Sequence, residues 1–307
     1  MTNGVLEERI RKEGFRGDVR RQVPMREITS FRIGGPADLI LFPRDLEDLQ
    51  VLITLFQREG VRYLLLGNGT NLLVSDSEVR EPLISLSQGF TEIKKEGAKI
   101  TAEGGVGLSQ LLHFCAENAL SNLEPLAGIP GTVGGGIRMN AGSGGVEMGD
   151  LISSLMVMDH LGQIRRLKRW EVSFGYRSVG LSPEDIILQG EFSLQMGKRE
   201  EIMEEMEDFL RRRRGTQPLS LPSAGSIFKN PQGISAGKLI EGVGLKGFRL
   251  GDAMVSPMHA NFIVNLGAAR ARDVLRLIDL IKERVYRERG VRLELEVVII
   301  GEPGVVG

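Results

Sequence analysis

The chain has 307 residues, of which 41% are hydrophobic and 26% are charged, and its formal net charge is −1. This is the composition of an ordinary globular protein, with enough length for two or three compact units. The balanced charge argues against a protein that binds nucleic acid through a basic surface. No segment approaches the roughly 20 apolar residues that span a membrane.

The N-terminal residues are charged and lack the apolar region of a secretory signal, so we expect a cytoplasmic protein. The single cysteine, Cys115, excludes an intramolecular disulfide, and its helical register predicts a buried side chain rather than a nucleophile. A monomer is the simplest expectation. No metal is expected, because zinc-binding spacing is absent among the three histidines His113, His160 and His259.

The first part of the chain alternates predicted helices with short strands. Residues 1–22 suggest a surface helix. From Asp45, apolar residues at helical spacing predict a helix that ends at Gly60, because glycine is typical of the position after a helix. Three short strands are expected, over 37–42, 62–66 and 72–74.

Two further patterns follow. Short strands dominate from residue 81 to 197, interrupted by a helix between Leu108 and Ala119. A highly charged helix from about residue 198 then leads into a final part, in which a strong helix over 271–289 is followed by Gly290. A shorter helix is expected near 236–243, and strands over 82–86, 91–94, 99–103, 151–158, 164–168, 185–195, 261–266 and 291–300.

Two glycine-rich loops stand out. The longer, Leu126 to Asp150, has nine glycines among the 23 residues from Ala127 to Gly149, which argues against a stable helix or strand. The shorter, Gly67 to Asn71, joins two predicted strands. It matches neither a Rossmann fingerprint nor a P-loop, yet its amides suit a pyrophosphate. Bare backbone in two loops predicts a flat or phosphorylated ligand; the alternative is a glycine-rich surface loop.

Three sets of residues are candidates for chemistry. Ser226 lies in a segment bracketed by prolines, which would hold its hydroxyl as a proton donor, although a turn serine explains the same sequence. Arg177 follows Tyr176 in a turn, where a guanidinium suits a carboxylate or phosphate or forms a surface ion pair. Glu294 and Glu296 share one face of a predicted strand, which borders either a cleft or solvent.

Six motifs in this order closely resemble the UDP-N-acetylenolpyruvoylglucosamine reductase family. The resemblance covers about residues 20 to 301. The motifs are TSFRIGG at 29–35, GNGTNLLV at 67–74, AGIPGTVGG at 127–135, GYRS at 175–178, GSIFKNP at 225–231 and LELEV at 293–297.

This resemblance implies an α+β fold in three parts. An FAD-binding fold of the vanillyl-alcohol oxidase type would comprise two subdomains, 1–80 and 81–197, and a C-terminal α+β substrate-binding domain would comprise 198–307. The implied protein is a flavoenzyme of peptidoglycan synthesis. NADPH would reduce FAD and leave. UDP-N-acetylglucosamine enolpyruvate would then become UDP-N-acetylmuramate, by hydride transfer from flavin N5 to C3 and protonation at C2.

The resemblance also assigns roles to residues. Arg177 would hold the substrate carboxylate, Glu296 would act as a protonated or hydrogen-bonding partner, and Ser226 would deliver the proton to C2. Glu296 rather than Glu294 stands before the valine of the motif. The substrate would also contact Tyr176, Lys229 and Asn230. The implied FAD-binding residues are Gly67, Asn68, Gly69, Thr70, Asn71, Gly128, Pro130, Gly131, Thr132, Gly134, Gly135, Asn140 and Ala141.

One feature departs from the family pattern. Some members carry an extra loop, with a tyrosine that closes over the substrate, between the Tyr-Arg turn and the serine motif. Here Arg177 and Ser226 are 49 positions apart (226 − 177) with no tyrosine between them, as in a shorter subtype without that lid. Closure over the nucleotide would fall to Arg211–Arg214 or to the C-terminal residues, although an arginine run is also typical of a solvated helix end.

Two alternatives stay open. The first is another FAD oxidoreductase of the same fold, such as an alcohol or lactone oxidase, although His113 and Cys115 both fall in a helix and give no sign of a covalent flavin. The second is a UDP-sugar binding module that has lost the redox chemistry. The intact set of Arg177, Ser226 and Glu296 argues against this second alternative.

Overall fold

The computed structural model describes residues 3–301, which form two compact units. The first unit comprises the chain up to residue 21, residues 39–68 and residues 81–211. The second comprises residues 22–38, 69–80 and the chain from 212 on. The three functional domains expected above, 1–80, 81–197 and 198–307, stay a prediction, because they concern where cofactor and substrate bind.

A four-stranded sheet has the strand order β1-β2-β5-β3, with β5 parallel to both β2 and β3. Its core includes apolar side chains from the two helices α1 and α3, together with Leu39, Leu41 and Ile84 of the sheet. The elements of this region are α1 (Asn3–Lys12), β1 (Asp18–Pro24), α2 (Met25–Ile28), β2 (Pro36–Phe42), α3 (Leu46–Glu59), β3 (Leu64–Leu65), β4 (Leu72–Val74) and β5 (Leu83–Ile84).

The ends of α3 agree with the sequence, but the predicted helix over 1–22 is too long. The Asp45 side chain caps α3 by accepting from the Asp48 amide, and Gly60 ends it with φ 64°. The first helix instead ends at Lys12, and Gly14 has φ 95°. At Gly17 a Cβ atom would overlap the Phe42 carbonyl. The chain therefore turns and continues as strand β1.

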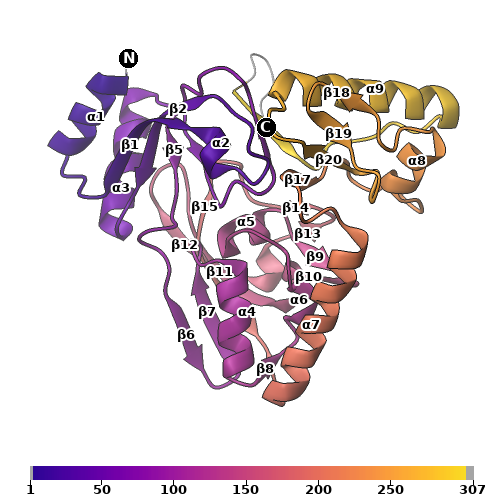
Figure 1. Cartoon of the computed structure of the whole chain (residues 1–307). Helices are drawn as coiled ribbons and strands as arrows, with labels where there is room; N and C mark the ends of the chain where they lie inside the picture. The colour runs from indigo at the N-terminus through magenta and orange to yellow at the C-terminus, as the bar shows by residue number, and fades with distance from the viewer. Residues whose placement is uncertain (1–2, 302–307) are drawn as a thin grey trace. The chain divides into compact units, whose positions relative to one another are not determined.

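The second sheet is five-stranded and antiparallel, with the order β12-β11-β15-β7-β6. Helices α4 and α5 pack against it (Figure 1) and bury a common core. Cys115 lies in that core with 1% of its surface exposed, as predicted. The elements are β6 (Ile93–Glu96), β7 (Lys99–Glu103), α4 (Leu108–Glu117), α5 (Val133–Arg138), β11 (Ile152–Met158), β12 (Ile164–Lys168) and β15 (Ile186–Ser193).

The long glycine run contains a helix, which the sequence argued against. Helix α5 begins after Thr132, whose side chain accepts from the Gly135 amide. Its glycines are needed for close packing: a Cβ on Gly134 would lie 3.0 Å from the Gly104 carbonyl oxygen, and one on Gly136 2.5 Å from the Met148 sulfur. The low helix propensity of glycine is thus offset by contacts that a side chain would prevent.

Several short elements and one long helix, α7, connect this sheet to the rest of the chain. Most are two-residue strands, which pair antiparallel: β10 with β9, β13 with β14 and β16 with β8. The elements are β8 (Leu120–Ser121), η1 (Glu124–Leu126), β9 (Gly142–Ser143), β10 (Val146–Glu147), α6 (Met148–Leu151), η2 (Arg169–Glu171), β13 (Phe174–Gly175), β14 (Ser178–Val179), β16 (Gln195–Met196) and α7 (Arg199–Thr216).

The second unit is built on an antiparallel sheet with the order β17-β20-β19-β18. Helix α9 has a buried stripe that includes Val274, Leu277 and Ile278, and it contacts β18, β19 and helix α8. The elements are β17 (Ser223–Ser226), α8 (Ala236–Gly242), β18 (Arg249–Leu250), β19 (Ala253–Val255), β20 (Phe262–Asn265), α9 (Ala271–Arg289) and β21 (Val298–Ile300).

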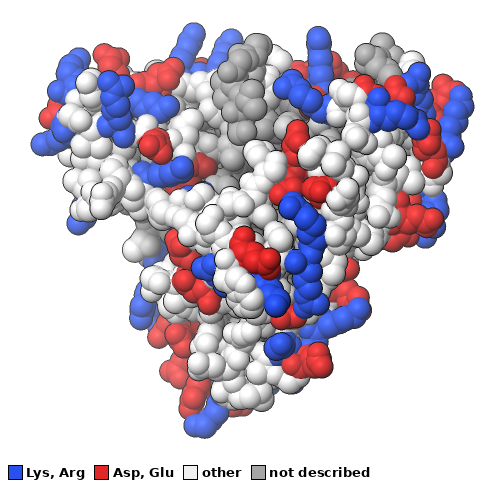
Figure 2. All heavy atoms as spheres, turned by 180° about the vertical axis from the view of Figure 1, so that it is seen from behind, with Lys and Arg blue, Asp and Glu red and all other residues white. Residues whose placement is uncertain are grey.

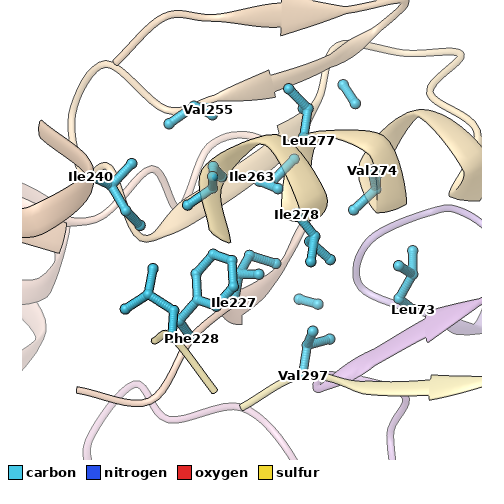
Figure 3. Packing of buried hydrophobic residues seen from close by; sticks show 14 of the residues in the cluster. Leu73, Ile227, Phe228, Ile240, Val255, Ile263, Val274, Leu277, Ile278 and Val297 are labelled. Atoms are coloured by element: carbon cyan, nitrogen blue, oxygen red, sulfur yellow. The ribbon is translucent and has the colours of Figure 1, made fainter. Parts of the chain in front are cut away.

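The segment after Ser226 is anchored in the core of this unit. Ile227 and Phe228 point into the same apolar cluster as Leu277 and Ile278 of α9 (Figure 3), and both are at most 1% exposed. The strand predicted over 291–300 is regular only at β21, which pairs parallel with β4. Residues before it instead pass along this segment, with an isolated bridge between Phe228 and Leu295.

Lysines and arginines are interspersed with aspartates and glutamates on the face shown in Figure 2. Over residues 3–301, no helix combines the length and the apolar character needed to cross a bilayer.

Candidate functional site

A cavity of about 120 Å³ lies in the first unit, where the two predicted glycine loops meet. Gly67 of the shorter loop faces Thr132 of the longer one, so close that a Cβ on Gly67 would lie 3.1 Å from the Thr132 hydroxyl oxygen. The cavity is lined by five glycines, by six leucines and isoleucines, and by Ser87, Thr132 and Arg138. The glycines and aliphatic residues are Gly67, Gly104, Gly105, Gly134, Gly135, Leu65, Leu66, Ile84, Leu86, Ile186 and Ile187.

The glycines of the lining leave room in the cavity because they carry no side chain. At two of them, a Cβ atom would overlap a backbone carbonyl. A Cβ on Gly104 would overlap the Ile187 carbonyl, and one on Gly105 would overlap the Leu86 carbonyl. Neither Gly104 nor Gly105 was singled out from the sequence. The signal available there was a glycine pair directly after the strand predicted over 99–103.

Arg138 is the one cationic residue among those that line the cavity. Its guanidinium donates to the Ser182 carbonyl at 2.9 Å and to the Asp185 carbonyl. Burial lowers the pKa of this guanidinium, opposed by the nearby Asp185 carboxylate, yet arginine stays protonated in proteins.

The cavity fits part of the FAD molecule that the resemblance implies. Its volume of about 120 Å³ is below the roughly 300–1,000 Å³ of pockets that enclose a whole small ligand. Aliphatic walls and bare backbone suit a flat ring rather than a charged pyrophosphate. The amides of Gly134 and Gly135 are also already bonded, to the Gly104 carbonyl and to the Thr132 hydroxyl.

Arg177 lies in the same unit, at the tip of the β13–β14 hairpin. This two-residue turn holds Arg177 at φ 55°, a left-handed conformation that is uncommon for residues other than glycine. The guanidinium carbon stands 5.0 Å from the centre of the neighbouring Tyr176 ring, and Tyr176 as a residue is 44% exposed. One guanidinium nitrogen, Nη1, lies 4.0 Å from Oε1 of Glu147.

Asn140, expected to bind the cofactor, has its side chain engaged within the protein. The residue is 1% exposed. Its amide nitrogen donates to Glu147 Oε2 at 2.5 Å and to the Gly175 carbonyl at 3.0 Å, and its oxygen accepts from the Gly149 amide at 2.9 Å. Sequence reasoning missed Glu147, because nothing local relates it to a turn thirty residues later.

Ser226 belongs to the second unit, at the end of strand β17. The pairing of β17 with β20 is irregular between Ser223 and Ser226, and Gly225 has φ 75°. Such a bulge redirects the next side chain. The following backbone is bonded on both sides: the Ile227 amide donates to the Asn261 carbonyl at 2.8 Å, and its carbonyl accepts from the Glu296 amide at 2.9 Å.

The backbone of Glu296 is therefore a direct neighbour of the Ser226 segment. It is also tied to the shorter glycine loop, since the Asn71 side-chain amide donates to the Glu296 carbonyl at 3.1 Å. Glu296 is half-buried, whereas the Glu294 side chain is 78% exposed.

The two other predicted substrate residues lie on the same segment. The Lys229 ammonium stands 3.7 Å from a Glu294 carboxylate oxygen, and the Lys229 amide donates to the Glu294 carbonyl. The Asn230 side-chain oxygen accepts from the Ala236 amide at 3.0 Å, which places Asn230 at the start of helix α8.

The predicted site residues are distributed over both units. The first unit contains Arg177, Tyr176, Gly67, Asn68 and the predicted residues of the longer loop; the second contains Ser226, Glu296, Lys229, Asn230 and Gly69 to Asn71. Of the expected closing elements, the arginine run is exposed at Arg211, Arg212 and Arg214 and half-buried at Arg213. Residues 302–307 lie outside the described residues. Across residues 3–301, no three acidic, histidine or cysteine side chains converge as metal ligands would.

Two family matches cover most of the chain. Residues 37–168 match the FAD binding domain family, and residues 217–300 match the C-terminal domain of UDP-N-acetylenolpyruvoylglucosamine reductase.

Close relatives match along almost their whole length. The UDP-N-acetylenolpyruvoylglucosamine reductase of Syntrophus aciditrophicus is 45% identical over 286 residues, which cover 92% of this chain and 91% of that protein. The enzyme of the same name from Heliobacterium modesticaldum is 44% identical over 292 residues, or 94% and 93%. The crystal structure of the Thermus caldophilus reductase superposes with a TM-score of 0.81 at 40% identity, covering 93% of this chain and 100% of that chain. The α+β, FAD-binding fold expected from the sequence is confirmed.

Proposed function

This chain belongs to the UDP-N-acetylenolpyruvoylglucosamine reductase family, and on that basis we propose that Arg177, Ser226 and Glu296 carry its reaction. The protein is an FAD-dependent oxidoreductase that uses NADPH to reduce UDP-N-acetylglucosamine enolpyruvate to UDP-N-acetylmuramate in peptidoglycan synthesis. Bound FAD supplies a hydride from N5 to C3 of the enolpyruvyl group. The remaining tasks fall to the protein's own residues.

The first task is to stabilise charge. Hydride addition at C3 leaves negative charge on C2 and on the adjoining carboxylate, and preorganised donors aimed at such a developing charge lower the barrier. Arg177 binds the substrate carboxylate through its planar guanidinium. Glu296 supplies a protonated or hydrogen-bonding group to the same enediolate-like species.

The second task is to protonate C2, which we assign to the Ser226 hydroxyl. A serine is a weak acid, so it must be held in place relative to the atom that it protonates. The single observation that carries the proposal is this rigidity. The irregular pairing of β17 orients Ser226, and the next residue, Ile227, is bonded on one side to Asn261, just before β20, and on the other to Glu296.

The remaining predicted residues bind the two ligands. Tyr176, Lys229 and Asn230 contact the substrate. FAD is held by Gly67, Asn68, Gly69, Thr70, Asn71, Gly128, Pro130, Gly131, Thr132, Gly134, Gly135, Asn140 and Ala141, with one of its rings in the cavity beside Gly67 and Thr132. Support for this last point comes from the aliphatic side chains and the glycine backbone that line that cavity.

We further propose that the enzyme works in the cytoplasm as a monomer, without nucleic-acid or membrane partners. The absence of nucleic-acid partners is supported by the net charge of −1 and by the mixture of basic and acidic side chains on the face shown in Figure 2. Sedimentation of the FAD-loaded protein tests the oligomeric state, and a mass of two or more chains would contradict it.

Anaerobic half-reactions test the catalytic assignment. In Ser226→Ala, NADPH should bleach the flavin at the normal rate. Reoxidation by the enolpyruvyl nucleotide should slow by about 100- to 10,000-fold, because a general acid contributes that much. Ser121→Ala removes a serine that bonds the Gln195 carbonyl at 3.2 Å and serves as the control, with both half-reactions unchanged.

Three results would contradict the proposal. Normal reoxidation of Ser226→Ala would mean that another group protonates C2. A preparation that binds no FAD would refute the flavoenzyme. Reoxidation by oxygen but not by the enolpyruvyl nucleotide would indicate an oxidase of the same fold.

A further inference from the structure

Building on the proposed role of Arg177, we infer that Glu147 is a positioning residue that holds the Arg177 guanidinium, and that Asn140 holds Glu147. These three residues come from three separate segments: the end of helix α5, strand β10 and the β13–β14 turn. All of them lie in the first unit.

Asn140 is the fixed point of this arrangement. It directly follows Met139, the C-cap of α5, with φ 41° and only 1% of its surface exposed. Both ends of its amide are used: the nitrogen donates to Glu147 Oε2 and to the Gly175 carbonyl, and the oxygen accepts from the Gly149 amide. One buried side chain thereby holds both Glu147 and the backbone that enters the Arg177 turn.

Glu147 uses its two carboxylate oxygens for different partners. Oε2 accepts from Asn140 at 2.5 Å, and Oε1 lies 4.0 Å from Nη1 of Arg177. The Glu147 and Arg177 side chains are 33% and 19% exposed. This pair is better shielded from solvent than the Lys198–Glu201 pair of helix α7, whose side chains are 76% and 66% exposed. Partial burial strengthens an ion pair because water screens it less.

The arrangement would help Arg177 to bind a carboxylate. A free arginine side chain samples many rotamers, and a substrate that must order it loses binding free energy. A guanidinium has five N–H donors in a planar fork, and binding a carboxylate uses only part of that set. The left-handed backbone of Arg177 also requires support from its surroundings, which the bond from Asn140 to Gly175 provides.

Neutralising Glu147 has opposite expected effects on substrate binding, depending on whether Glu147 acts through its charge alone or by positioning Arg177. If Glu147 acted only through its negative charge, it would weaken the binding of an anionic substrate by Coulomb repulsion, and its neutralisation would tighten binding. If it positions Arg177, neutralisation must instead weaken binding and slow the step that needs the aligned guanidinium.

The experiment compares Glu147→Gln and Glu147→Asp with the wild type as FAD-loaded proteins. For Glu147→Gln we expect unchanged FAD content and unchanged flavin reduction by NADPH. Reoxidation by the enolpyruvyl nucleotide should slow by about 100-fold, as for a misplaced catalytic group, with a higher KM for that substrate alone. Glu147→Asp keeps the charge and should recover part of the rate. Glu201→Gln, which neutralises the exposed helical pair, is the matched control and should behave as the wild type.

The Arg177→Lys variant distinguishes the proposed role of Arg177 from the positioning role of Glu147. If Arg177→Lys reoxidises normally, the proposed role of Arg177 fails. If Arg177→Lys is slow but Glu147→Gln is normal or binds substrate more tightly, only the positioning role fails. Equal loss of FAD content and of both half-reactions in Glu147→Gln would show a merely structural role and would also overturn it. In the double variant Arg177→Lys/Glu147→Gln, the two losses should be less than additive.

Discussion

The side-chain amide of Asn71 donates a hydrogen bond to the backbone carbonyl of Glu296 at 3.1 Å, across 225 positions of sequence. The Asn71 carbonyl in turn accepts from the Val298 amide at 3.0 Å, and strands β4 and β21 continue as a parallel pair. The end of the shorter glycine loop is thereby joined to the segment that carries a proposed catalytic carboxyl group. A change in the loop should therefore affect chemistry as well as cofactor binding.

We expect Asn71→Ala to lower the free energy of unfolding by ~1 kcal/mol, the usual loss for one hydrogen bond. It should also slow flavin reoxidation by the enolpyruvyl nucleotide, because the Glu296 backbone loses a support. Stopped-flow absorbance of the reduced flavin measures the second effect.

Asn118→Ala is the matched control for Asn71→Ala, because it also removes an amide that bonds a backbone carbonyl, that of Phe114 at 2.9 Å. It should cost similar stability and leave reoxidation unchanged. If both variants slowed reoxidation equally, the specific link between Asn71 and Glu296 would be refuted.

Gly67→Ala should weaken FAD binding while the fold persists. The added methyl group would stand 3.1 Å from the Thr132 hydroxyl and enter the cavity wall. If the clash of about 1–3 kcal/mol falls on the FAD-bound state, the dissociation constant for FAD should rise about 5- to 150-fold. Fluorescence titration of the apoprotein with FAD measures it.

The control for Gly67→Ala is Gly215→Ala, at a glycine of helix α7 with no atom within 4 Å of the added Cβ. Its affinity for FAD should equal that of the wild type. Wild-type affinity in Gly67→Ala as well would show that the cofactor does not occupy this cavity.

Cys115 should be unreactive in the folded protein. Burial raises the pKa of its thiol to about 12, and the thiolate is the reactive form. At about pH 8, an aromatic disulfide reagent should label no thiol in the native protein and one thiol per chain in denaturant. Rapid labelling of the native protein would contradict the packing of helix α4.

His259 should make stability depend on pH. Burial, with a smaller contribution from Lys246, lowers the pKa of its imidazole below the ordinary 6.5. Between these two pKa values the unfolded chain binds a proton that the folded chain does not, so stability falls as the pH drops from about 6.5 to the folded-state pKa. Urea unfolding midpoints over this range measure the slope.

The His259→Gln variant should have a smaller slope in that range. His160→Gln replaces an exposed histidine and should keep the wild-type slope. An unchanged slope in His259→Gln would assign the pH dependence to other groups.

Much of the architecture follows from local patterns. The sequence predicted the apolar stripes of α3 and α9 and the glycines that end these helices. The stripes could be predicted because a buried helical face requires apolar residues three or four positions apart. Helix α5 could not be predicted from the sequence, because its glycines lower helix propensity. These glycines permit the close approach of Gly104 and Met148, which the sequence does not show.

Through their resemblance to a known family, six ordered motifs in the sequence determined the family, the cofactor and the candidates for catalysis, since each motif is a contiguous run that can be recognised without the fold. Only the tertiary structure decided which of these residues support one another. Asn140, whose cofactor contact stays a proposal, also anchors Glu147 and the backbone before the Arg177 turn, and Glu296 is the backbone neighbour of the Ser226 segment. The physical reason is that hydrogen bonds between remote segments depend on how strands and loops pack, and no local periodicity records that packing.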